Sequence, residues 1–270
     1  MTRMEHRFAQ LRATGRKALV PFITAGDPSL EATVPVMHAL VAAGADVIEL
    51  GVPFSDPMAD GPVIQRSSER ALARGAGLER VLQMVREFRR DDPDTPVVFM
   101  GYLNPVEVRG ADRYAAALVE AGVDGTLLVD LPPEEAADYR KAFAAAGLDL
   151  ILLAAPTSTP ERMALLREQG SGYLYYVSYA GVTGADRLDS GQAGSRLREL
   201  REGSPVPVVV GFGIRDAESA VRMSAQADGV VVGSALVTAM AGATGAADAA
   251  RLAGGFLAPL RAGLDAASGG

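Results

Sequence analysis

The sequence Ala43-Gly44-Ala45-Asp46 recurs, with a change at its third position, as Ala121-Gly122-Val123-Asp124 and as Ala146-Gly147-Leu148-Asp149. In each copy an amphipathic segment ends at the alanine, and a short apolar run follows the aspartate. Glycine is common just past a helix end, because it readily adopts the left-handed backbone conformation. A helix stop followed at once by a buried strand is typical of a fold in which helices alternate with parallel strands.

Apolar runs of this kind occur eight times along the chain. Each is almost continuously apolar, as expected for a strand that is buried on both faces of a parallel sheet. Eight such units favour an α/β fold of the closed (β/α)8 type, a TIM barrel, over an open doubly wound sheet. No GxGxxG follows the first strand, which also weakens the open-sheet alternative. The expected strands are Leu19–Thr24, Val47–Leu50, Val97–Met100, Gly125–Val129, Leu150–Ala154, Tyr173–Ser178, Val208–Gly211 and Gly229–Val232.

Amphipathic segments between and around these runs predict the helices. The first expected helix precedes the first strand and is extra to the barrel, and the last, which is rich in alanine, closes the chain. The interval between the second and third strands is unusually long, which predicts additional structure there. We see no linker, so we expect residues 1–270 to form one barrel domain, close to the ~250 residues typical of this fold. The helices expected most clearly are Met4–Ala13, Leu30–Ala43, Ala111–Ala121, Pro133–Ala146 and Ala246–Ala267.

Composition excludes several classes of function. The chain has no cysteine, so it has no disulfide, thiolate nucleophile or cysteine metal site. A net charge of −7 with dispersed arginine is unlike a nucleic-acid-binding protein. The N-terminus lacks the apolar core of a signal peptide, and no stretch approaches the roughly 18 apolar residues of a membrane span. We therefore expect a soluble, cytoplasmic α/β protein.

The scarcity of lysine and histidine restricts the chemistry further. Lys17 precedes the first strand and Lys141 lies in an expected helix, so neither is placed to form a Schiff base where the strands end. His6 and His38 also lie in expected helices, which argues against a metal site built from several histidines. The remaining acid–base groups are carboxylates and tyrosines.

Active sites of (β/α)8 barrels lie at the C-terminal ends of the strands. Glu49 interrupts the apolar second strand, and a carboxylate there is either an acid–base group in a pocket or one half of a buried salt bridge. The proline-rich loop that follows carries Asp56 and Asp60. Aspartate beside proline and glycine is also ordinary turn chemistry, and spacing alone does not choose between these two aspartates.

Glycine-rich segments follow the last three strands. They are Gly181-Val182-Thr183-Gly184, Gly211-Phe212-Gly213 and Gly233-Ser234, the last of which opens a short helix. Loops after strands seven and eight together with a helix N-terminus are the usual phosphate site of this fold. The alternative for each segment is a tight turn that binds nothing.

The motifs of the chain resemble the tryptophan synthase alpha-subunit family over nearly its whole length. The longest and most specific match surrounds the second strand, and Tyr179 stands where some members have arginine. The matching segments are Pro21-Phe22-Ile23-Thr24-Ala25-Gly26-Asp27-Pro28, Ile48 to Gln65, Met100-Gly101-Tyr102-Leu103-Asn104-Pro105, Asp130-Leu131-Pro132-Pro133-Glu134-Glu135, Gly181-Val182-Thr183-Gly184 and Gly211-Phe212-Gly213-Ile214.

This resemblance implies a reaction, a site and a partner. It implies that the chain is a lyase that cleaves indole-3-glycerol phosphate to indole and glyceraldehyde 3-phosphate in tryptophan biosynthesis. It implies an α2β2 heterotetramer in which only the beta subunit carries pyridoxal phosphate, with no cofactor in this chain. Glu49 would be the catalytic acid–base and Asp60 its partner. Substrate would be bound by Phe22, Ile64, Met100, Tyr102, Leu127, Val129, Leu153, Tyr175, Thr183 and Phe212, and its phosphate by Gly184, Gly213, Gly233 and Ser234.

The resemblance also gives the two carboxylates different tasks. Retro-aldol cleavage needs an electron sink, which the indole ring provides once it is protonated at C3. We expect Glu49 to move the protons and Asp60 to accept a hydrogen bond from the ring N–H. The loops around residues 56–60 and 179–191 would be lids.

Three other functions remain possible at this point. A sugar-phosphate isomerase or epimerase would share the phosphate loops but would need neither the second-strand motif nor the apolar ring pocket. A stand-alone indole-releasing lyase would perform the same chemistry without a partner. A non-catalytic subunit would have no reason to retain Glu49 and Asp60.

Overall fold

The computed structural model describes residues 1–177, 192–211 and 213–268 of the chain. Eight parallel strands pair in sequence order, and β8 pairs back onto β1, so that the sheet closes into a barrel. The predicted (β/α)8 barrel is therefore confirmed, with strand ends that agree to within one or two residues. The strands are β1 (Ala18–Thr24), β2 (Ile48–Gly51), β3 (Val97–Gly101), β4 (Gly125–Leu128), β5 (Asp149–Ala154), β6 (Leu174–Val177), β7 (Val208–Gly211) and β8 (Gly229–Val232).

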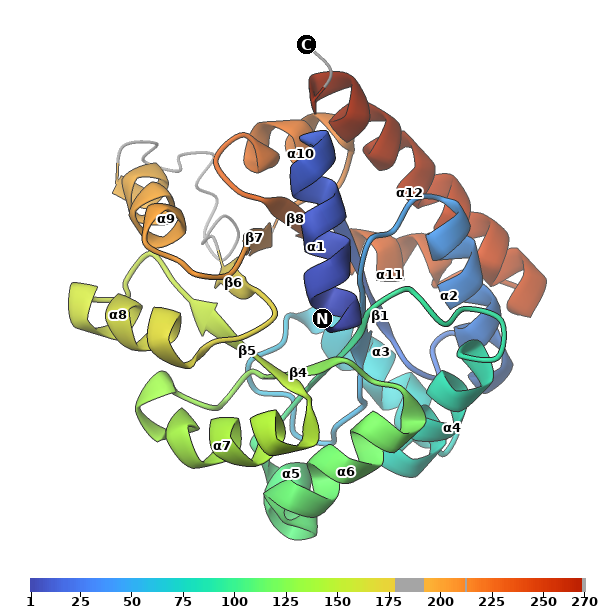
Figure 1. The fold of residues 1–270 in the computed structure, drawn as a ribbon. Helices are drawn as coiled ribbons and strands as arrows, with labels where there is room; N and C mark the ends of the chain where they lie inside the picture. Colours follow the sequence, from blue (N-terminus) through green and yellow to red (C-terminus); the bar gives the residue numbers. More distant parts are fainter. Residues whose placement is uncertain (178–191, 212, 269–270) are drawn as a thin grey trace.

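Helices surround this barrel, and the extra N-terminal helix α1 lies across one end of it (Figure 1). The long interval between β2 and β3 holds two helices, α3 and α4, where the sequence predicted additional structure. The short helix expected after the last strand is α11. The helices are α1 (Arg3–Thr14), α2 (Thr33–Ala42), α3 (Pro62–Ala73), α4 (Leu78–Phe88), α5 (Leu103–Arg109), α6 (Ala111–Ala121), α7 (Ala136–Ala146), α8 (Pro160–Gln169), α9 (Gln192–Glu202), α10 (Ala217–Ser224), α11 (Ser234–Met240) and α12 (Ala246–Ser268).

Two expected helices begin later than the sequence suggested. Instead of one helix over Leu30–Ala43, the chain forms a 3-10 turn, η1 (Leu30–Ala32), and then α2. Pro133–Ala146 likewise divides into η2 (Pro133–Glu135) and α7. Such tight turns are frequent where helices start, and periodicity alone does not separate them from the helix.

The apolar core has two parts, because successive strand residues point to opposite sides of the barrel wall. Ile48 and Leu50 belong to the outer cluster, between the barrel and its helices. Val20, Phe22 and Val98 belong to the inner cluster, which fills the barrel. This alternation directs Glu49 inward, since it lies between Ile48 and Leu50 and pairs in register with Phe22 and Val98.

The joints that predicted the fold have the expected backbone. Gly44, Gly122 and Gly147 follow α2, α6 and α7 with φ values of 96°, 90° and 80°. These left-handed conformations end each helix and turn the chain into the next strand. Among the residues that the structure describes, no helix is both long and apolar enough to cross a membrane.

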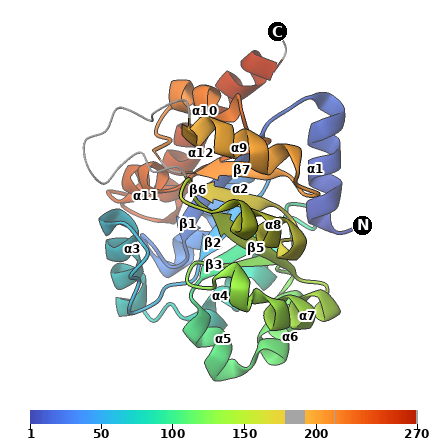
Figure 2. The ribbon, with the colours of Figure 1, turned by 90° about the vertical axis from the view of Figure 1, so that its left-hand side faces the viewer.

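Figure 2 shows the barrel from the side. Helix α1 lies at one end, and α3 and α11 lie at the other. Because α1 precedes β1 whereas α3 and α11 follow β2 and β8, the latter end carries the C-termini of the strands. The site expected from the sequence therefore lies at the end opposite α1.

Candidate active site

Glu49 is completely buried inside the barrel. The Tyr173 hydroxyl donates a hydrogen bond to its Oε1 over 2.5 Å, whereas Oε2 is buried without a hydrogen-bond partner among the described residues. Burial raises the Glu49 pKa to about 7, although the hydrogen bond from Tyr173 opposes this shift. The structure therefore excludes the salt-bridge alternative among the described residues and leaves one oxygen able to exchange a proton near neutral pH.

Asp60 lies on the loop between β2 and α3 and is partly buried. The Tyr102 hydroxyl donates to Asp60 Oδ2 over 2.9 Å and accepts a hydrogen bond from the Ala59 amide over 3.1 Å. Burial raises the Asp60 pKa, and the Tyr102 hydrogen bond partly opposes the rise. Asp56, the other aspartate of this loop, is exposed, and among the described residues its carboxylate accepts only from the adjacent Ser55 hydroxyl. The structure thus distinguishes the two aspartates that spacing could not.

The predicted ring-binding side chains gather in one place. All of those that the structure describes, apart from Tyr102, belong to the inner cluster of the barrel or pack against it. Tyr102 joins four of them around a small cavity beside Asp60. These cavity residues come from β1, α3, β3 and the segment after β4, which shows how the barrel brings distant parts of the sequence together. The residues of the inner cluster predicted to bind substrate are Phe22, Ile64, Met100, Leu127, Val129, Leu153 and Tyr175.

Tyr175 approaches the β7 backbone closely at Gly211. A Cβ atom at Gly211 would lie 1.9 Å from the Tyr175 hydroxyl oxygen, so any larger residue there would displace the tyrosine. Burial and the nearby Glu49 charge raise the Tyr175 pKa well above its ordinary value, which keeps the phenol protonated. Gly211 therefore has a structural reason to be glycine that differs from phosphate binding.

The expected phosphate loops are described in part. Gly213 has φ 76°, a left-handed conformation suited to a tight turn after β7. Gly233 precedes α11, and Ser234 is its exposed first residue. Both glycines are thus near the same barrel end as Glu49. Thr183, Gly184 and Phe212 lie outside the described residues, as does the expected lid over residues 179–191.

Two aromatic residues of the site were not predicted from the sequence. Tyr173 was expected only as a strand residue, yet it donates to Glu49. Phe54 stacks on Tyr102 with ring centroids 5.0 Å apart and so supports the tyrosine that holds Asp60. The alternation of Tyr173 and Tyr175 along one barrel strand was the available signal, because residues two apart face the same side.

The residues excluded from the site by the sequence are placed elsewhere. Lys17 lies just before β1, at the α1 end of the barrel, and Lys141 lies on α7. His6 and His38 are in α1 and α2. Within the described parts of the chain, no group of three or more histidine, aspartate and glutamate residues is arranged to hold a metal ion.

Comparison with known proteins agrees with this arrangement. A family model described as tryptophan synthase alpha chain matches residues 8–253. This chain belongs to the tryptophan synthase alpha chain family. The alpha chain of Xanthomonas oryzae pv. oryzae (strain MAFF 311018) is 66% identical over 268 residues, which cover 99% of this chain and 100% of the relative. That of Xylella fastidiosa (strain M12) is 67% identical over 266 residues, 98% of this chain and 99% of the relative.

Solved structures of tryptophan synthase share the fold. The subunit alpha of Legionella pneumophila str. Paris superposes with a TM-score of 0.91 and 46% identity, covering 98% of this chain and 99% of that one. A chain from the a2b2 complex of Pyrococcus furiosus gives 0.84 and 37%, covering 91% and 98%. The family, the barrel and the assignment to the lyases of tryptophan biosynthesis are therefore confirmed.

Proposed function

We propose that this chain cleaves indole-3-glycerol phosphate to indole and glyceraldehyde 3-phosphate, as the alpha subunit of tryptophan synthase. Glu49 carries the proposal. It is a fully buried carboxylate with a pKa raised to about 7, and one of its oxygens has no hydrogen-bond partner among the described residues. An acid–base group is most effective when its pKa lies near the working pH, because both of its protonation states are then populated.

In the proposed reaction Glu49 acts twice. As an acid, it protonates C3 of the indole ring, and the ring then holds a positive charge that can accept electrons. As a base, it takes the proton from the glycerol hydroxyl next to the ring. That oxygen becomes the carbonyl of glyceraldehyde 3-phosphate while the C–C bond breaks, and its electrons neutralise the ring. Glu49 ends protonated, as it began, and no lysine or metal is needed.

Asp60 stabilises the charge on the ring in this proposal. Its carboxylate accepts a hydrogen bond from the indole N–H, where positive charge develops as C3 is protonated. Tyr102 holds Asp60 through its hydroxyl, and Phe54 holds Tyr102 by stacking. These contacts keep the carboxylate oriented before substrate binds, which is how electrostatic stabilisation becomes effective.

The remaining predicted residues would bind the two ends of the substrate. The aromatic and aliphatic side chains grouped around Phe22 and Met100 offer an apolar surface to the ring. Phe212, which lies outside the described residues, would be a further contact. Tyr175 and Thr183 would face the glycerol chain. The phosphate would accept hydrogen bonds from main-chain N–H groups at Gly184, Gly213 and Gly233 and from the Ser234 hydroxyl.

We further propose that residues 1–270 act as one cytoplasmic domain bound to a beta subunit in an α2β2 heterotetramer. Pyridoxal phosphate would belong to that subunit, and this chain would use no cofactor of its own. Met58 and Val108 are 85% and 80% exposed on the loop after β2 and on α5, which follows β3. Large apolar side chains exposed at the barrel end that carries the site are typical of a protein interface.

The reaction is tested by indole release from indole-3-glycerol phosphate, measured for the purified chain with and without a tryptophan synthase beta subunit. Slow release that accelerates with beta supports the alpha-subunit role. Fast release without beta would indicate a stand-alone lyase, and none in either case would return the sugar-phosphate barrels to consideration.

Two variants test the residue roles. Glu49→Gln should lower turnover by about 10³-fold or more, because it removes the group that moves the protons. Asp60→Asn should also be severely impaired, because it removes the negative charge that stabilises the protonated ring. Both should still bind a phosphate ester. Asp56→Asn is the matched control on the same loop, since it leaves Tyr102 and Asp60 untouched, and basal turnover should stay near that of the parent. Turnover retained by Glu49→Gln, or near-normal rates in Asp60→Asn, would refute the corresponding assignment.

The position of the partner is tested by reversing a charge on the same loop. Asp56→Lys should weaken activation by beta more than it weakens basal substrate binding, because Asp56 is exposed at the barrel end proposed to face beta. Unchanged activation would count against that interface.

A further inference from the structure

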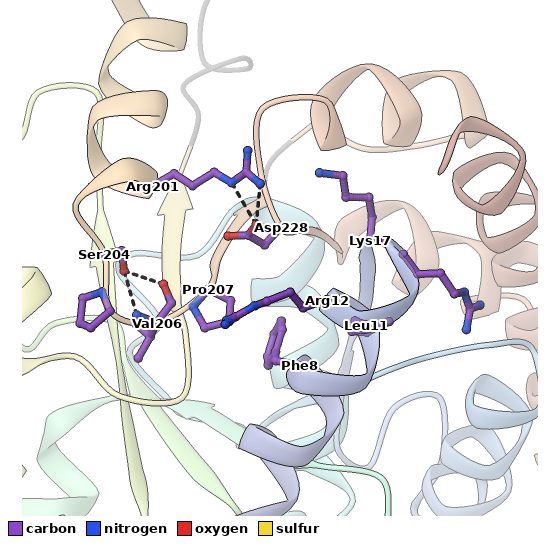
Figure 3. Close-up of a pocket in the computed structure, with 12 residues that line it drawn as sticks. Phe8, Leu11, Arg12, Lys17, Arg201, Ser204, Val206, Pro207 and Asp228 are labelled. Carbon is purple, nitrogen blue, oxygen red and sulfur yellow. Dashed lines mark hydrogen bonds and ion pairs between the residues drawn. The ribbon is translucent and has the colours of Figure 1, made fainter. Parts of the chain in front are cut away.

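A second cavity lies at the opposite end of the barrel from Glu49. It occupies about 400 Å³ between α1, the start of β1 and the turns that lead into β7 and β8 (Figure 3). We call it the basal pocket. The proposed reaction makes no use of it. Its lining residues are Phe8, Leu11, Arg12, Gly15, Arg16, Lys17, Arg201, Ser204, Pro205, Val206, Pro207 and Asp228.

Positive charge dominates the basal pocket, although the chain as a whole carries a net charge of −7. Among the lining residues that the structure describes, four are cations and Asp228 is the one carboxylate. Two of the cations are already paired. Arg16 donates to both carboxylate oxygens of Asp265 over 2.9 and 3.0 Å, and Arg201 donates to Asp228 over 2.9 Å.

The other two cations have no acidic partner among the described residues. Arg12 forms no hydrogen bond or ion pair through its side chain with any of the described residues. The Lys17 ammonium donates to the main-chain oxygen of Ala227 over 2.7 Å and forms no ion pair within the same part of the chain. Figure 3 shows Arg12 and Lys17 on the α1 side of the pocket and Arg201 on the facing wall. Two uncompensated positive charges thus share one cavity.

The electrostatics of Lys17 agree with this imbalance. Its pKa is lowered first by burial and then by the positive charge of Arg201, and the negative charge of Asp228 offsets the shift only in part. An anion bound between these groups would stabilise the ammonium and raise that pKa again.

We propose that the basal pocket binds a phosphate monoester that has a small apolar body. A phosphate monoester carries a charge of about −1.5 to −2 at neutral pH, which matches the two unpaired cations. Ligand pockets commonly span ~300–1,000 Å³, so the cavity has room for more than the phosphate group. Phe8, Leu11 and Pro207 form an apolar wall beside the cations, suited to a ring or short hydrocarbon.

The two lysines of the chain provide a test that reports on this pocket alone. Selective ¹³C labelling of lysine gives one ε-CH2 signal from Lys17 and one from Lys141, which is exposed on α7 and serves as an internal control. Titration with phenyl phosphate should shift the Lys17 signal saturably, raise the Lys17 pKa and leave Lys141 unmoved. Inorganic phosphate should do the same at higher concentration, since it lacks the apolar body. Binding at the other end of the barrel does not report at Lys17.

Matched variants separate a built site from a general effect of charge. Arg12→Gln should raise the phenyl phosphate concentration that gives half of the Lys17 shift about tenfold or more, as expected for loss of a charge-assisted contact to phosphate. Arg140→Gln removes another exposed arginine, on α7, and should change nothing. The proposal is overturned if Lys17 does not respond, if Lys17 and Lys141 shift together as they would in sodium chloride of equal ionic strength, or if Arg140→Gln weakens the response as much as Arg12→Gln.

Discussion

Burying a carboxylate such as Glu49 lowers the stability of the folded protein. The same burial raises the pKa of the carboxylate, which the proposed acid–base role requires. The barrel interior disfavours the charged form, and the single hydrogen bond from Tyr173 compensates only in part. A well-paired glutamate would be more stable in its ionised form, but its pKa would fall too low for it to donate a proton near pH 7. Oε2, which has no hydrogen-bond partner among the residues that the structure describes, is therefore consistent with an acid–base role.

This cost predicts how stability depends on pH. Folding raises the Glu49 pKa from 4.5 to about 7, so the folded protein holds the proton more tightly than the unfolded chain. The stability that this difference provides is present in full below pH 4.5 and is lost as the pH rises through 7. Glu49→Gln cannot ionise and should avoid that loss, gaining about 3 kcal/mol relative to the parent between pH 5 and 8.5. Urea unfolding of both proteins at the two pH values measures it.

A matched glutamate on the surface serves as the control for that measurement. Glu120→Gln removes an exposed carboxylate from α6, and the difference between this variant and the parent should hardly change with pH. If Glu49→Gln and the parent lose stability in parallel between pH 5 and 8.5, the Glu49 pKa is not raised and the proposed acid–base role loses its support.

Sequence reasoning reached some of the site residues and not others, for a physical reason. Glu49 was predicted as a site residue because a charged residue interrupts an apolar strand, which is a local signal. Tyr173 donates to it from 124 positions away in the chain, and no local pattern reports such a contact. Spacing could not distinguish Asp60 from Asp56. What distinguishes them is that Asp60 accepts a hydrogen bond from the Tyr102 hydroxyl, and Tyr102 reaches the loop from the end of β3.

At the scale of elements, one hydrogen bond from main chain to side chain recurs at the start of alternate strands. Asp46 accepts a hydrogen bond from the Leu19 amide, Asp124 from Val97 and Asp228 from Val208, each over 2.9 Å. In each case a side chain just before one strand binds the first part of the preceding strand. Ser171 does the same for the Leu150 amide over 2.8 Å, so the interaction occurs in four of the eight strand pairs of the barrel, β1–β2, β3–β4, β5–β6 and β7–β8.

Burial should decide how much each of these aspartates contributes. Asp124 also pairs with Arg89, and the two side chains are only 6% and 10% exposed. Asp124→Asn should cost about 3 kcal/mol, because it leaves the Arg89 charge buried without its partner. Asp228→Asn is the matched control, since Asp228 and Arg201 are 29% and 42% exposed, and it should cost about 1 kcal/mol or less. Urea unfolding compares them, and equal costs would show that burial of the ion pair is not what matters.

The same hydrogen bond explains the repeated sequence pattern and its limits. Gly44 and Gly122 end helices, and the aspartates two residues later, Asp46 and Asp124, bind the preceding strand. Asp149 occupies the same place in the third copy, yet it starts an odd-numbered strand, and its Oδ2 is buried without a hydrogen-bond partner among the described residues. The pattern predicted the helix stops correctly but could not show which aspartates bind a strand, because that depends on closure of the barrel.

At the scale of the whole molecule, the two ends of the barrel are built differently. The end that carries the strand C-termini holds Glu49, Asp60 and the expected phosphate loops. The other end is closed by α1, whose Met4, Phe8 and Leu11 belong to the inner cluster of the barrel. A capping box between Thr2 and Glu5 stabilises the start of this helix. The sequence predicted this extra helix but not that its apolar face completes the barrel interior.

Helix α1 should therefore matter to the stability of the entire barrel. Phe8 is 5% exposed, and the centroid of its ring lies 6.0 Å from the centroid of the Tyr173 ring. Phe8→Ala should cost about 3 kcal/mol, because it opens a cavity beneath the strands that neighbouring side chains can fill only in part. Val119→Ala on α6, where the side chain is 39% exposed, is the control and should stay within about 0.5 kcal/mol of the parent. Urea unfolding followed by far-ultraviolet circular dichroism, which reports on all helices at once, measures both. A cost at Phe8 no larger than that at Val119 would mean that α1 lies on the barrel without contributing to its core.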